Sequence, residues 1–427
     1  MNKNILVFPC GSEIGLEIHN SLRFAKNIKL FGASSVADHG RFVYKNYIEN
    51  LPHIDDPNFL TRLNEIIAQY KIDFIFPAHD SVVLKLAQER SNLNAEIMTS
   101  SAETCEIARS KKRTYEFFSD EDFVPEMFES IDEINEFPVF LKPDVGQGSK
   151  GIALARNKEE LKFHLDKAKD LLILEYLPGE EYTIDCFTDK NGKLKFIGKR
   201  VRKRIKSGIS VNSVTMPLDS STKEIAHRIN EKLEFRGAWF FQLKIDVNGQ
   251  FKLLEIAPRI AGTMSLYRNK GVNFSLLSLY DRLGYKLDVS DNDFEVEIDR
   301  ALINRFHLNY EYQKVYVDFD DTVTHHERVN PLLMQFLYQC VRDEKQLILI
   351  TKHIHDIKTT LKKLKISIEL FDEIIHLSKD EKKSAFIDKD VPAIFIDDSF
   401  QERSDIGRLN IPVFDVDSVE ALIDWRY

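Results

Sequence analysis

The stretch FPVFLKPDVGQGSKGIALA, residues 137–155, decides how the chain is interpreted. An apolar run ends in Lys142, a loop with Gly146, Gly148 and Gly151 follows, and a second apolar run begins. Glycines let backbone N–H groups approach an anion closely, and a neighbouring lysine adds a compact positive charge. Because the loop lies between two predicted strands, it differs from the strand-to-helix loop of Walker-type sites. Taken alone, the stretch fits either an anion-binding loop or an ordinary hairpin.

Three more motifs flank this loop in a fixed order. SKKRTYEFF (110–118) precedes it, and LEYLPGEEYTID (174–185) and FQLKIDVNGQFKLLEIAPR (241–259) follow it. Together the four stretches resemble the ATP-grasp superfamily, in particular the branch near carbamoyl phosphate synthetase and the carboxylate–amine ligases. The resemblance covers about residues 1–305. It implies a two-step reaction: a carboxylate attacks the γ-phosphorus of ATP, and an amine or similar nucleophile then captures the acyl phosphate.

The resemblance also implies which residues bind ATP. Two lysines would contact the phosphates, the glycine loop would close over the triphosphate, and the backbone after the third strand would meet the adenine edge. A glutamate further on would accept hydrogen bonds from the ribose hydroxyls, and two arginines would face the triphosphate. The implied set is Lys111, Lys142, Gly146, Gly148, Ser149, Gly151, Glu175, Tyr176, Leu177, Glu181, Arg202 and Arg204.

A metal site is expected where Gln242 and Glu255 lie on two strands joined by the turn VNGQ. Oxygen ligands suit Mg²⁺ bridging phosphates, or Mn²⁺ in its place. The family usually has an Asn two residues after the glutamate, but this chain has Ala257, so one oxygen ligand is absent. Asp246 is a candidate substitute if the strand continues that far. Arg259 stands where the family has an arginine that stabilises the transferred phosphoryl group.

A second group of acids occurs in VYVDFDDTVT, residues 315–324. Asp318 and Asp320 are two residues apart on an extended chain, so both can face one direction. One aspartate can attack phosphorus covalently, and the other can act as acid and then base. Two close carboxylates repel each other unless a cation lies between them, which favours Mg²⁺. A strand-end turn with solvated acids is the alternative.

Later motifs complete this second site. Thr351 ends the run LILIT, Lys383 precedes SAFI on a predicted amphipathic helix, and Asp397 and Asp398 follow AIFI. With VYVDFDDTVT, these motifs resemble the haloacid dehalogenase-like phosphatase superfamily over about residues 315–427. The gaps between the motifs leave no room for a separate cap domain.

The phosphatase resemblance assigns each of these residues a role. Asp318 would be the nucleophile and Asp320 the acid and base. Thr351 and Lys383 would contact the phosphoryl oxygens; Lys379 and Lys382 are alternatives to Lys383, which the spacing to Ile387 favours. The implied metal ligands of this site are Asp318, Asp320, Asp397 and Asp398. A metal-binding role for His325 and His326 is a further option, but ordinary loop histidines are the favoured interpretation.

The overall pattern predicts a multidomain protein of mixed α/β and α+β class. Residues 1–110 alternate strands and helices, as in an open parallel sheet, and the loops at 10–15, 33–35 and 78–81 would lie at its ligand-binding edge. Residues 111–305 predict antiparallel sheets with helices, the ATP-grasp domain. A joint near 306–314 leads to a capless, Rossmann-like α/β domain at 312–427.

The composition limits the classes of partner that the protein is expected to bind. A formal net charge of −9 argues against general binding to nucleic acid or anionic membrane. The basic run KRVRKRIKSG (199–208) lacks the interleaved aromatics of a nucleic-acid stripe. The four cysteines are scattered and predict reduced thiols in a cytoplasmic protein, and no apolar stretch reaches the ~18 residues of a membrane span. The assembly is left open, with a homodimer as one option.

The sequence therefore predicts a bifunctional enzyme. Its ATP-dependent ligase half would use small carboxylate and amine substrates, and its phosphatase half would act on a phosphorylated metabolite of the same pathway. The missing Asn at Ala257 leaves one alternative of another class: a nucleotide-binding module without ligase activity that regulates a working phosphatase.

Overall fold

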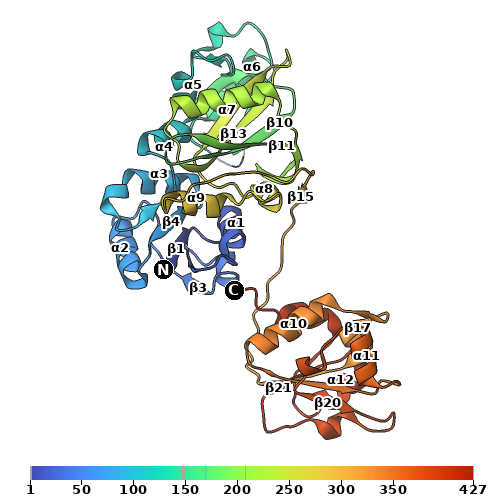
Figure 1. Ribbon diagram of the computed structural model, residues 1–427. Helices are drawn as coiled ribbons and strands as arrows, with labels where there is room; N and C mark the ends of the chain where they lie inside the picture. The colour runs from blue at the N-terminus through green and yellow to red at the C-terminus, as the bar shows by residue number, and fades with distance from the viewer. Residues whose placement is uncertain (1, 147, 149, 169, 207, 427) are drawn as a thin grey trace. The chain divides into compact units, whose positions relative to one another are not determined.

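The chain forms two compact units, Met1–Leu302 and Ile303–Tyr427 (Figure 1). The computed structural model describes residues 2–426 except 147, 149, 169 and 207. None of the helices in that part of the chain is long and apolar enough to cross a membrane. Each unit has hydrophobic clusters of its own, so the two are treated separately below.

The N-terminal unit begins with a five-stranded parallel sheet of order β3-β2-β1-β4-β5. Its central strand is buried because helices cover the sheet, which explains the continuous apolar run at its start. The strand order reverses between β1 and β4, so the loops after these strands flank a crevice. The strands are β1 (Lys3–Phe8), β2 (Ile28–Ala33), β3 (Asn46–Ile48), β4 (Phe74–Pro77) and β5 (Glu96–Ile97); the helices are α1 (Glu13–Leu22), α2 (Phe59–Tyr70), α3 (Asp80–Gln88) and α4 (Ala102–Arg109).

A four-stranded antiparallel sheet of order β6-β9-β7-β8 follows. The stretch 137–155 forms the hairpin of β7 (Val139–Pro143) and β8 (Ala153–Ala155), in which Val139 pairs with Ala155. The hairpin loop therefore contains the glycines that the sequence pointed to. The other elements are α5 (Lys111–Phe117), β6 (Met127–Phe128), α6 (Lys158–Lys167) and β9 (Leu171–Glu175).

A six-stranded antiparallel sheet of order β14-β13-β10-β11-β12-β15 completes the unit. Helix α7 (Ser220–Lys232) packs against β10 and β11, and Trp239 is fully buried beneath it in one core cluster. The strands are β10 (Glu181–Thr188), β11 (Leu194–Lys206), β12 (Ile209–Met216), β13 (Gly237–Ile245), β14 (Phe251–Ala257) and β15 (Glu297–Asp299).

The parallel sheet and the six-stranded sheet share one hydrophobic core. Side chains of β1 and α1 pack with residues of β13, α8 (Ser265–Asn269) and α9 (Phe274–Arg282). The buried Glu17 of α1 also accepts from Arg268 at 2.7 and 3.1 Å. The predicted regions 1–110 and 111–305 are therefore parts of one compact unit, and a site between their sheets has fixed walls.

The C-terminal unit is built on a second five-stranded parallel sheet, of order β20-β19-β16-β21-β22. Apolar clusters cover both faces of its central strands. No further domain is inserted among its described residues. The elements are β16 (Lys314–Val317), β17 (Thr324–His325), β18 (Arg328–Val329), α10 (Pro331–Arg342), β19 (Gln346–Thr351), α11 (Ile357–Lys363), β20 (Glu373–His376), β21 (Ala393–Ile396), α12 (Phe400–Gly407) and β22 (Val413–Phe414).

One predicted element of this unit is wrong. Lys383 does not begin an amphipathic helix but lies in a short 3-10 turn, Lys383–Phe386. Lys383 and Ile387 are nevertheless both buried. The sequence spacing thus predicted correctly that Lys383 and Ile387 are buried, but it predicted the wrong type of helix.

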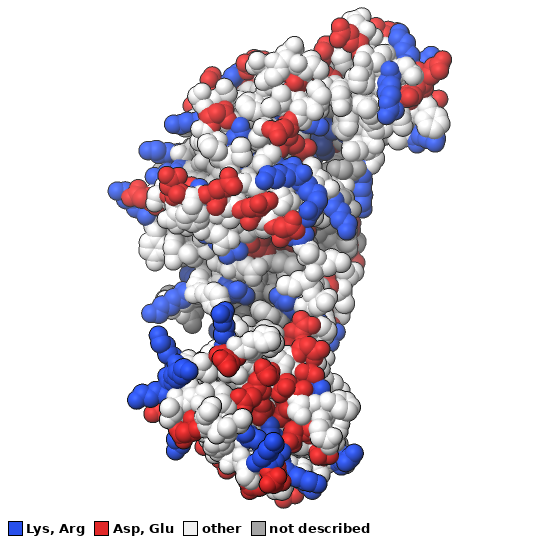
Figure 2. All heavy atoms as spheres, turned by 90° about the vertical axis from the view of Figure 1, so that its right-hand side faces the viewer, with Lys and Arg blue, Asp and Glu red and all other residues white. Residues whose placement is uncertain are grey.

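Charged side chains on the visible face of the N-terminal unit are of mixed sign (Figure 2). The basic run of β11 follows the same rule, since each of its first five cations lies beside a carboxylate. The pairs are Lys199 with Asp219, Arg200 with Asp185, Arg202 with Glu181, Lys203 with Glu297, and Arg204 with Asp299. Partnered cations of this kind do not form the open basic stripe that nucleic acids require.

Separate cores predict separate responses to mutation. Leu349 of β19 is fully buried in the C-terminal unit, so Leu349→Ala should lower that unit's free energy of unfolding by about 2–5 kcal/mol. Fluorescence of Trp425 in a Trp239→Phe background during urea unfolding reports this unit. The fully exposed Leu302→Ala is the control and should change nothing. An equal shift in the N-terminal unit's transition would contradict independent cores.

Candidate functional site

A cavity of about 360 Å³ lies between the four-stranded and six-stranded sheets of the N-terminal unit. Its apolar walls come from β7, β9 and β14, including Phe140, Leu174 and Leu254. Many of the predicted ATP-site residues line it: Lys111, Lys142, Gly146, Gly148, Glu175, Leu177, Glu181, Arg202, Gln242 and Glu255. Among the described residues, Gly151, Tyr176 and Arg204 do not line the cavity. The predicted Ser149 lies outside the described residues.

Lys142 is the most perturbed group of the cavity. Its Nζ donates to the Tyr115 hydroxyl at 2.6 Å and to the Leu254 carbonyl at 3.3 Å, neither of which carries a charge. Burial, reinforced by the nearby Lys111, lowers the pKa of Lys142 to about 7. Lys111 donates to the carbonyl of Asp144 at 3.1 Å, and burial lowers the pKa of this lysine too. Two desolvated cations side by side make a strong site for a polyanion.

The glycine loop packs against the turn between β11 and β12. A Cβ on Gly208 would lie 2.1 Å from the carbonyl carbon of Gly148, a distance that no side chain tolerates. Gly208 also has a φ of 74°, which L-residues rarely adopt. The backbones of the loop and the turn are therefore in contact at the edge of the cavity.

Gln242 and Glu255 face each other across β13 and β14, as a direct register pair. Arg202 donates to the side-chain oxygen of Gln242 at 3.2 Å and is paired with Glu181. Ala257 pairs with Phe240 on the same two strands and offers no side-chain oxygen. The two side-chain oxygens that the sequence assigned to a metal thus lie together, without a third from the position of the missing Asn.

Asp246 does not replace that Asn. Its buried carboxylate accepts from the backbone N–H groups of Asn248 and Gln250, both at 2.8 Å, and so shapes the VNGQ turn. The strand alternation on which the prediction relied fails because the pairing register shifts just after Gln242 and β13 ends at Ile245. Arg204, another predicted residue, is exposed and pairs with Asp299 at 2.8 Å.

A second cavity, of about 430 Å³, adjoins the first and shares Arg202, Gln242 and Glu255 with it. Its other wall is the crevice of the parallel sheet, at the loops after β1 and β4. The predicted Arg259 lies there, held by Asp80 at 2.5 and 3.0 Å. Burial alone would raise the pKa of Asp80, but this arginine lowers it below the usual value.

Several residues of the second cavity were not singled out from the sequence: Glu13, Asp80, Thr183, Arg200 and Arg300. The loops at 10–15 and 78–81 were expected at a ligand-binding edge, so the signal for Glu13 and Asp80 was their position directly after a strand. Thr183 and Arg200 are directly paired on β10 and β11, and Arg300 follows β15. None of the three follows a strand of the parallel sheet, so none gave a signal of this kind.

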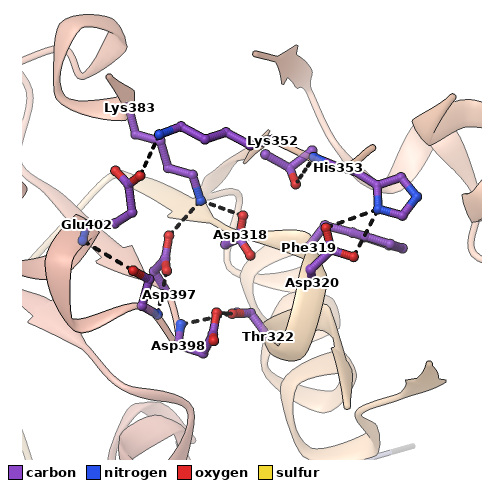
Figure 3. Close-up of polar contacts among 12 residues, drawn as sticks. Asp318, Phe319, Asp320, Thr322, Lys352, His353, Lys383, Asp397, Asp398 and Glu402 are labelled. Carbon is purple, nitrogen blue, oxygen red and sulfur yellow. Dashed lines mark hydrogen bonds and ion pairs between the residues drawn. The ribbon is translucent and has the colours of Figure 1, made fainter. Parts of the chain in front are cut away.

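The C-terminal unit brings its predicted residues together around Lys383 (Figure 3). The buried Nζ of Lys383 donates to Asp318 at 2.5 Å and to Asp397 at 2.6 Å. Burial raises the pKa of the Asp318 carboxyl, Lys383 opposes this shift, and Asp397 adds to it. Burial alone would lower the pKa of Lys383, but the two aspartates raise it. Thr351, fully buried, ends the neighbouring strand β19.

Asp320 turns to a different partner. Its exposed carboxylate lies 2.9 and 3.0 Å from Nδ1 of His353, whose Nε2 is 3.0 Å from the Thr360 hydroxyl (Figure 3). The expectation that Asp318 and Asp320 share a face assumed an extended chain. The strand ends at Val317, however; Asp318 and Asp320 keep extended backbone angles beyond it, and the chain turns at Asp321, whose φ is 51°.

Asp398 completes a carboxylate cluster. One oxygen each from Asp318, Asp397 and Asp398 lie within 4.8 Å of one another, a spacing that suits a cation. The Thr322 hydroxyl accepts from the Asp398 backbone N–H at 3.0 Å and so ties the two loops together. Asp320 is not part of this cluster. His325 and His326 are exposed on the β17–β18 hairpin, with their ring centroids 4.1 Å apart.

Comparisons with known proteins find relatives of the N-terminal unit. Residues 167–304 match a family model described as "ATP-grasp in the biosynthetic pathway with Ter operon". The comparisons support an ATP-grasp enzyme of the ligase type. The family match ends at residue 304, so it does not bear on the C-terminal unit.

Two curated relatives share part of the sequence of this chain. The arginine-specific carbamoyl phosphate synthase large chain of Bacillus subtilis is 27% identical over 160 residues, 34% of this chain and 15% of the relative. The D-alanine–D-alanine ligase of Fusobacterium nucleatum is 30% identical over 115 residues, 26% of this chain and 40% of the relative. The chain thus spans well under half the length of either relative.

A solved structure shares the fold of the N-terminal unit. It is the biotin carboxylase domain dimer of 2-oxoglutarate carboxylase from Hydrogenobacter thermophilus, in complex with MgADP, ADP and bicarbonate. The TM-score is 0.55 at 18% identity, with 68% of this chain and 72% of the other covered. The mixed architecture of parallel and ATP-grasp-like antiparallel sheets is therefore a known one.

The lowered pKa of Lys142 predicts that the free energy of unfolding depends on pH. Between its folded pKa of about 7 and its ordinary value of 10.5, the unfolded chain binds more protons than the folded one. The free energy of unfolding should therefore rise with pH in this window, by at most about 1.4 kcal/mol per pH unit from this group. Lys142→Met should lack the rise.

The measurement is urea unfolding at about pH 7, 8 and 9, followed by Trp239 fluorescence in a Trp425→Phe background. Lys223→Met, at an exposed position on α7, is the matched control and should keep the wild-type slope. A Lys142→Met slope equal to that of the wild type would show that Lys142 keeps an ordinary pKa in the folded protein.

Proposed function

We propose that the protein is a two-activity enzyme: an ATP-dependent ligase that joins a carboxylate to an amine through an acyl phosphate, and a phosphohydrolase that works through a phosphoaspartate. The observation that supports the ligase best is the pair of desolvated lysines, Lys111 and Lys142, in a cavity with an apolar floor. Such a cavity has one end for a flat apolar ring and another for a polyanion.

ATP fits the cavity in a definite direction. Its adenine would lie against Phe140, Leu174 and Leu177, next to the backbone at Glu175, and its phosphates would reach the two lysines. A bound triphosphate would raise the pKa of Lys142 again by offering it a negative partner. The glycine loop and the β11–β12 turn would close the cavity from the outside. The MgADP in the structurally similar biotin carboxylase domain supports the same use here.

Mg²⁺, or Mn²⁺ in its place, fits Gln242 and Glu255. An amide oxygen and a carboxylate on directly paired strands are oxygen donors of the type that Mg²⁺ takes alongside phosphates and water. Bound there, the ion would neutralise charge on the triphosphate. Ala257 leaves the set one oxygen short of the family pattern, and a water can fill that position.

The chain's own residues do little proton transfer in this half. Lys111 and Lys142 compensate the phosphate charge, and Arg259, fixed by Asp80, presents a cation next to the shared wall of the two cavities. The carboxylate oxygen attacks the γ-phosphorus, the bond to the β-phosphate oxygen breaks, and ADP leaves. The rate gain comes from positioning and from charges already in place.

The phosphohydrolase proposal rests on the arrangement around Lys383. Asp318 would attack phosphorus, while Lys383 and the strand-end Thr351 contact the phosphoryl oxygens. Asp320, held by His353, would protonate the leaving oxygen and then take a proton from the attacking water. The cluster of Asp318, Asp397 and Asp398 fits Mg²⁺, which would screen the phosphate from the acids. A phosphorylated small molecule is the substrate class.

The ligase half can be tested before its substrates are known. Hydroxylamine traps acyl phosphates as hydroxamates, so wild-type protein with ATP, Mg²⁺ and a panel of carboxylates should give hydroxamate and ADP. Lys142→Met and Glu255→Gln should each lower the rate by about 100-fold or more. Arg62→Gln, at an exposed site on α2, should not.

Two other outcomes would change the conclusion. ATP binding in a thermal shift experiment, with neither hydroxamate nor ADP from any carboxylate, would favour a nucleotide-sensing module over a ligase. The absence of both binding and turnover would overturn the ATP assignment itself. The assembly stays open, with a homodimer as one option.

The phosphatase half has its own test. Wild-type protein with Mg²⁺ should hydrolyse p-nitrophenyl phosphate, and Asp318→Asn should lose about 1,000-fold or more of this rate because it removes the nucleophile. Asp321→Asn is a matched control, since Asp321 is exposed and Asn tolerates its φ of 51°. Equal rates for Asp318→Asn and wild type, or no hydrolysis by either, would overturn the phosphoaspartate proposal.

A further inference from the structure

Arg300 differs from the other arginines of the second cavity. It is half-buried, and its guanidinium donates to the Ser210 carbonyl at 3.3 Å. Among the residues that the structure describes, no carboxylate lies within ion-pairing distance of it. The cavity's other arginines are paired: Arg200 with Asp185, Arg202 with Glu181, and Arg259 with Asp80. Within the described part of the chain, Arg300 is thus the arginine of this cavity whose charge is not paired with a carboxylate.

Glu13 lies near Arg300 but not against it. A Cβ on Gly262 would lie 2.9 Å from Cγ of Glu13 and 3.1 Å from Nη2 of Arg300, so the two side chains flank one glycine. Glu13 forms no ion pair within the described part of the chain. Burial lowers the pKa of Arg300, and the charges of Glu13 and of Glu17, which is itself paired with Arg268, oppose that shift as neighbours rather than as bonded partners. One open cation and one open anion therefore stand side by side.

A third polar group in this cavity is without a partner. The Thr183 hydroxyl is fully buried on β10 and forms no hydrogen bond in the structure. Thr183 pairs with Gln242 across β10 and β13, so its hydroxyl lies next to the wall that the two cavities share. A buried hydroxyl left without a partner costs free energy, and a polar ligand or water in the cavity would remove that cost.

We propose that the second cavity binds an α-amino acid as the amine substrate of the ligase. Arg300 holds its carboxylate, Glu13 holds its amino group, and Thr183 donates to a polar atom near the shared wall. A zwitterion can pair with Glu13 and Arg300 at once. A plain amine would pair only with Glu13, and a plain carboxylic acid only with Arg300. This assignment rests on the proposed ligase function, because it places the acceptor beside the site of acyl-phosphate formation.

The step balances with the groups named. The ammonium of the amino acid gives one proton to Glu13, and the neutral amine attacks the acyl carbon of the acyl phosphate. The new C–N bond forms as the C–O bond to phosphate breaks, and inorganic phosphate leaves with the bonding electrons and takes the second proton of the nitrogen. Glu13 then releases its proton to water. The products are an amide with a free carboxylate, ADP from the earlier step, and phosphate.

The test compares amino acids with analogues that lack one charge. Wild-type protein receives ATP, Mg²⁺, a carboxylate that gives hydroxamate, and either an amino acid from the standard set or its decarboxylated amine. Amide formation, followed by mass spectrometry, should occur with amino acids and fall by about 10- to 100-fold with the amines. In Arg300→Gln that preference should disappear through a rise in the KM for the amino acid, with the KM for ATP unchanged.

Two further variants separate binding from folding. Arg300→Lys keeps the charge and should recover part of the amino-acid KM, while Glu13→Gln should lower the rate more than it raises this KM. Arg62→Gln and Glu65→Gln, an exposed pair on α2, are matched controls and should behave as wild type. Retained hydroxamate formation shows that each variant folds and binds ATP.

The outcomes distinguish the two levels of the proposal. Hydroxamate formation together with equal use of amines and amino acids, or with an unchanged amino-acid KM in Arg300→Gln, would overturn the amino-acid assignment and leave the ligase intact. Loss of hydroxamate formation in the wild type would overturn the ligase, and the acceptor assignment with it.

Discussion

Burial of charge between two sheets is the constraint on which the N-terminal unit depends. The shared core of α1, β13 and α9 fixes the distance between the parallel sheet and the six-stranded sheet. The charged side chains between the two sheets are therefore partly removed from water. Most of them are therefore paired, as Arg200 is with Asp185 and Arg259 with Asp80. Among the described residues, Lys111 and Lys142 of the first cavity and Arg300 of the second have no carboxylate within ion-pairing distance, and each remains costly until an anion arrives.

The fold could be predicted further than the site. Apolar runs, turn residues and the glycine loop of 137–155 were enough for the sheet types, because strand periodicity and turn chemistry are local. Asp246 shows the limit: a register shift after Gln242 moved it from a metal site into a turn. Arg300 and Thr183 could not have been found in this way, since their role depends on which partners are missing in space, and a sequence does not show that.

The C-terminal unit shows the same limit in a different form. The order of Asp318, Thr351, Lys383 and Asp397 indicated that strand ends would bring them together, and topology alone achieves this in a parallel sheet. The direction of Asp320 was not predictable, because it depends on the loop that turns at Asp321 and on His353, a residue with no place in the motif. Strand alternation applies only as far as the strand itself, and β16 stops at Val317.

The two lysines at the centres of the two sites are in opposite electrostatic states. Lys142 touches a hydroxyl and a carbonyl and its pKa is lowered, whereas Lys383 touches two aspartates and its pKa is raised. The first site should therefore bind a polyanion favourably, because the anion supplies the negative partner that Lys142 lacks. The second site already places one lysine among several aspartates, so a phosphoryl group can enter only if a cation compensates the added negative charge. Metal dependence should accordingly be stricter for the phosphohydrolase than for nucleotide binding in the other unit, because Asp398 leaves the acidic cluster with more negative charge than Lys383 alone can neutralise.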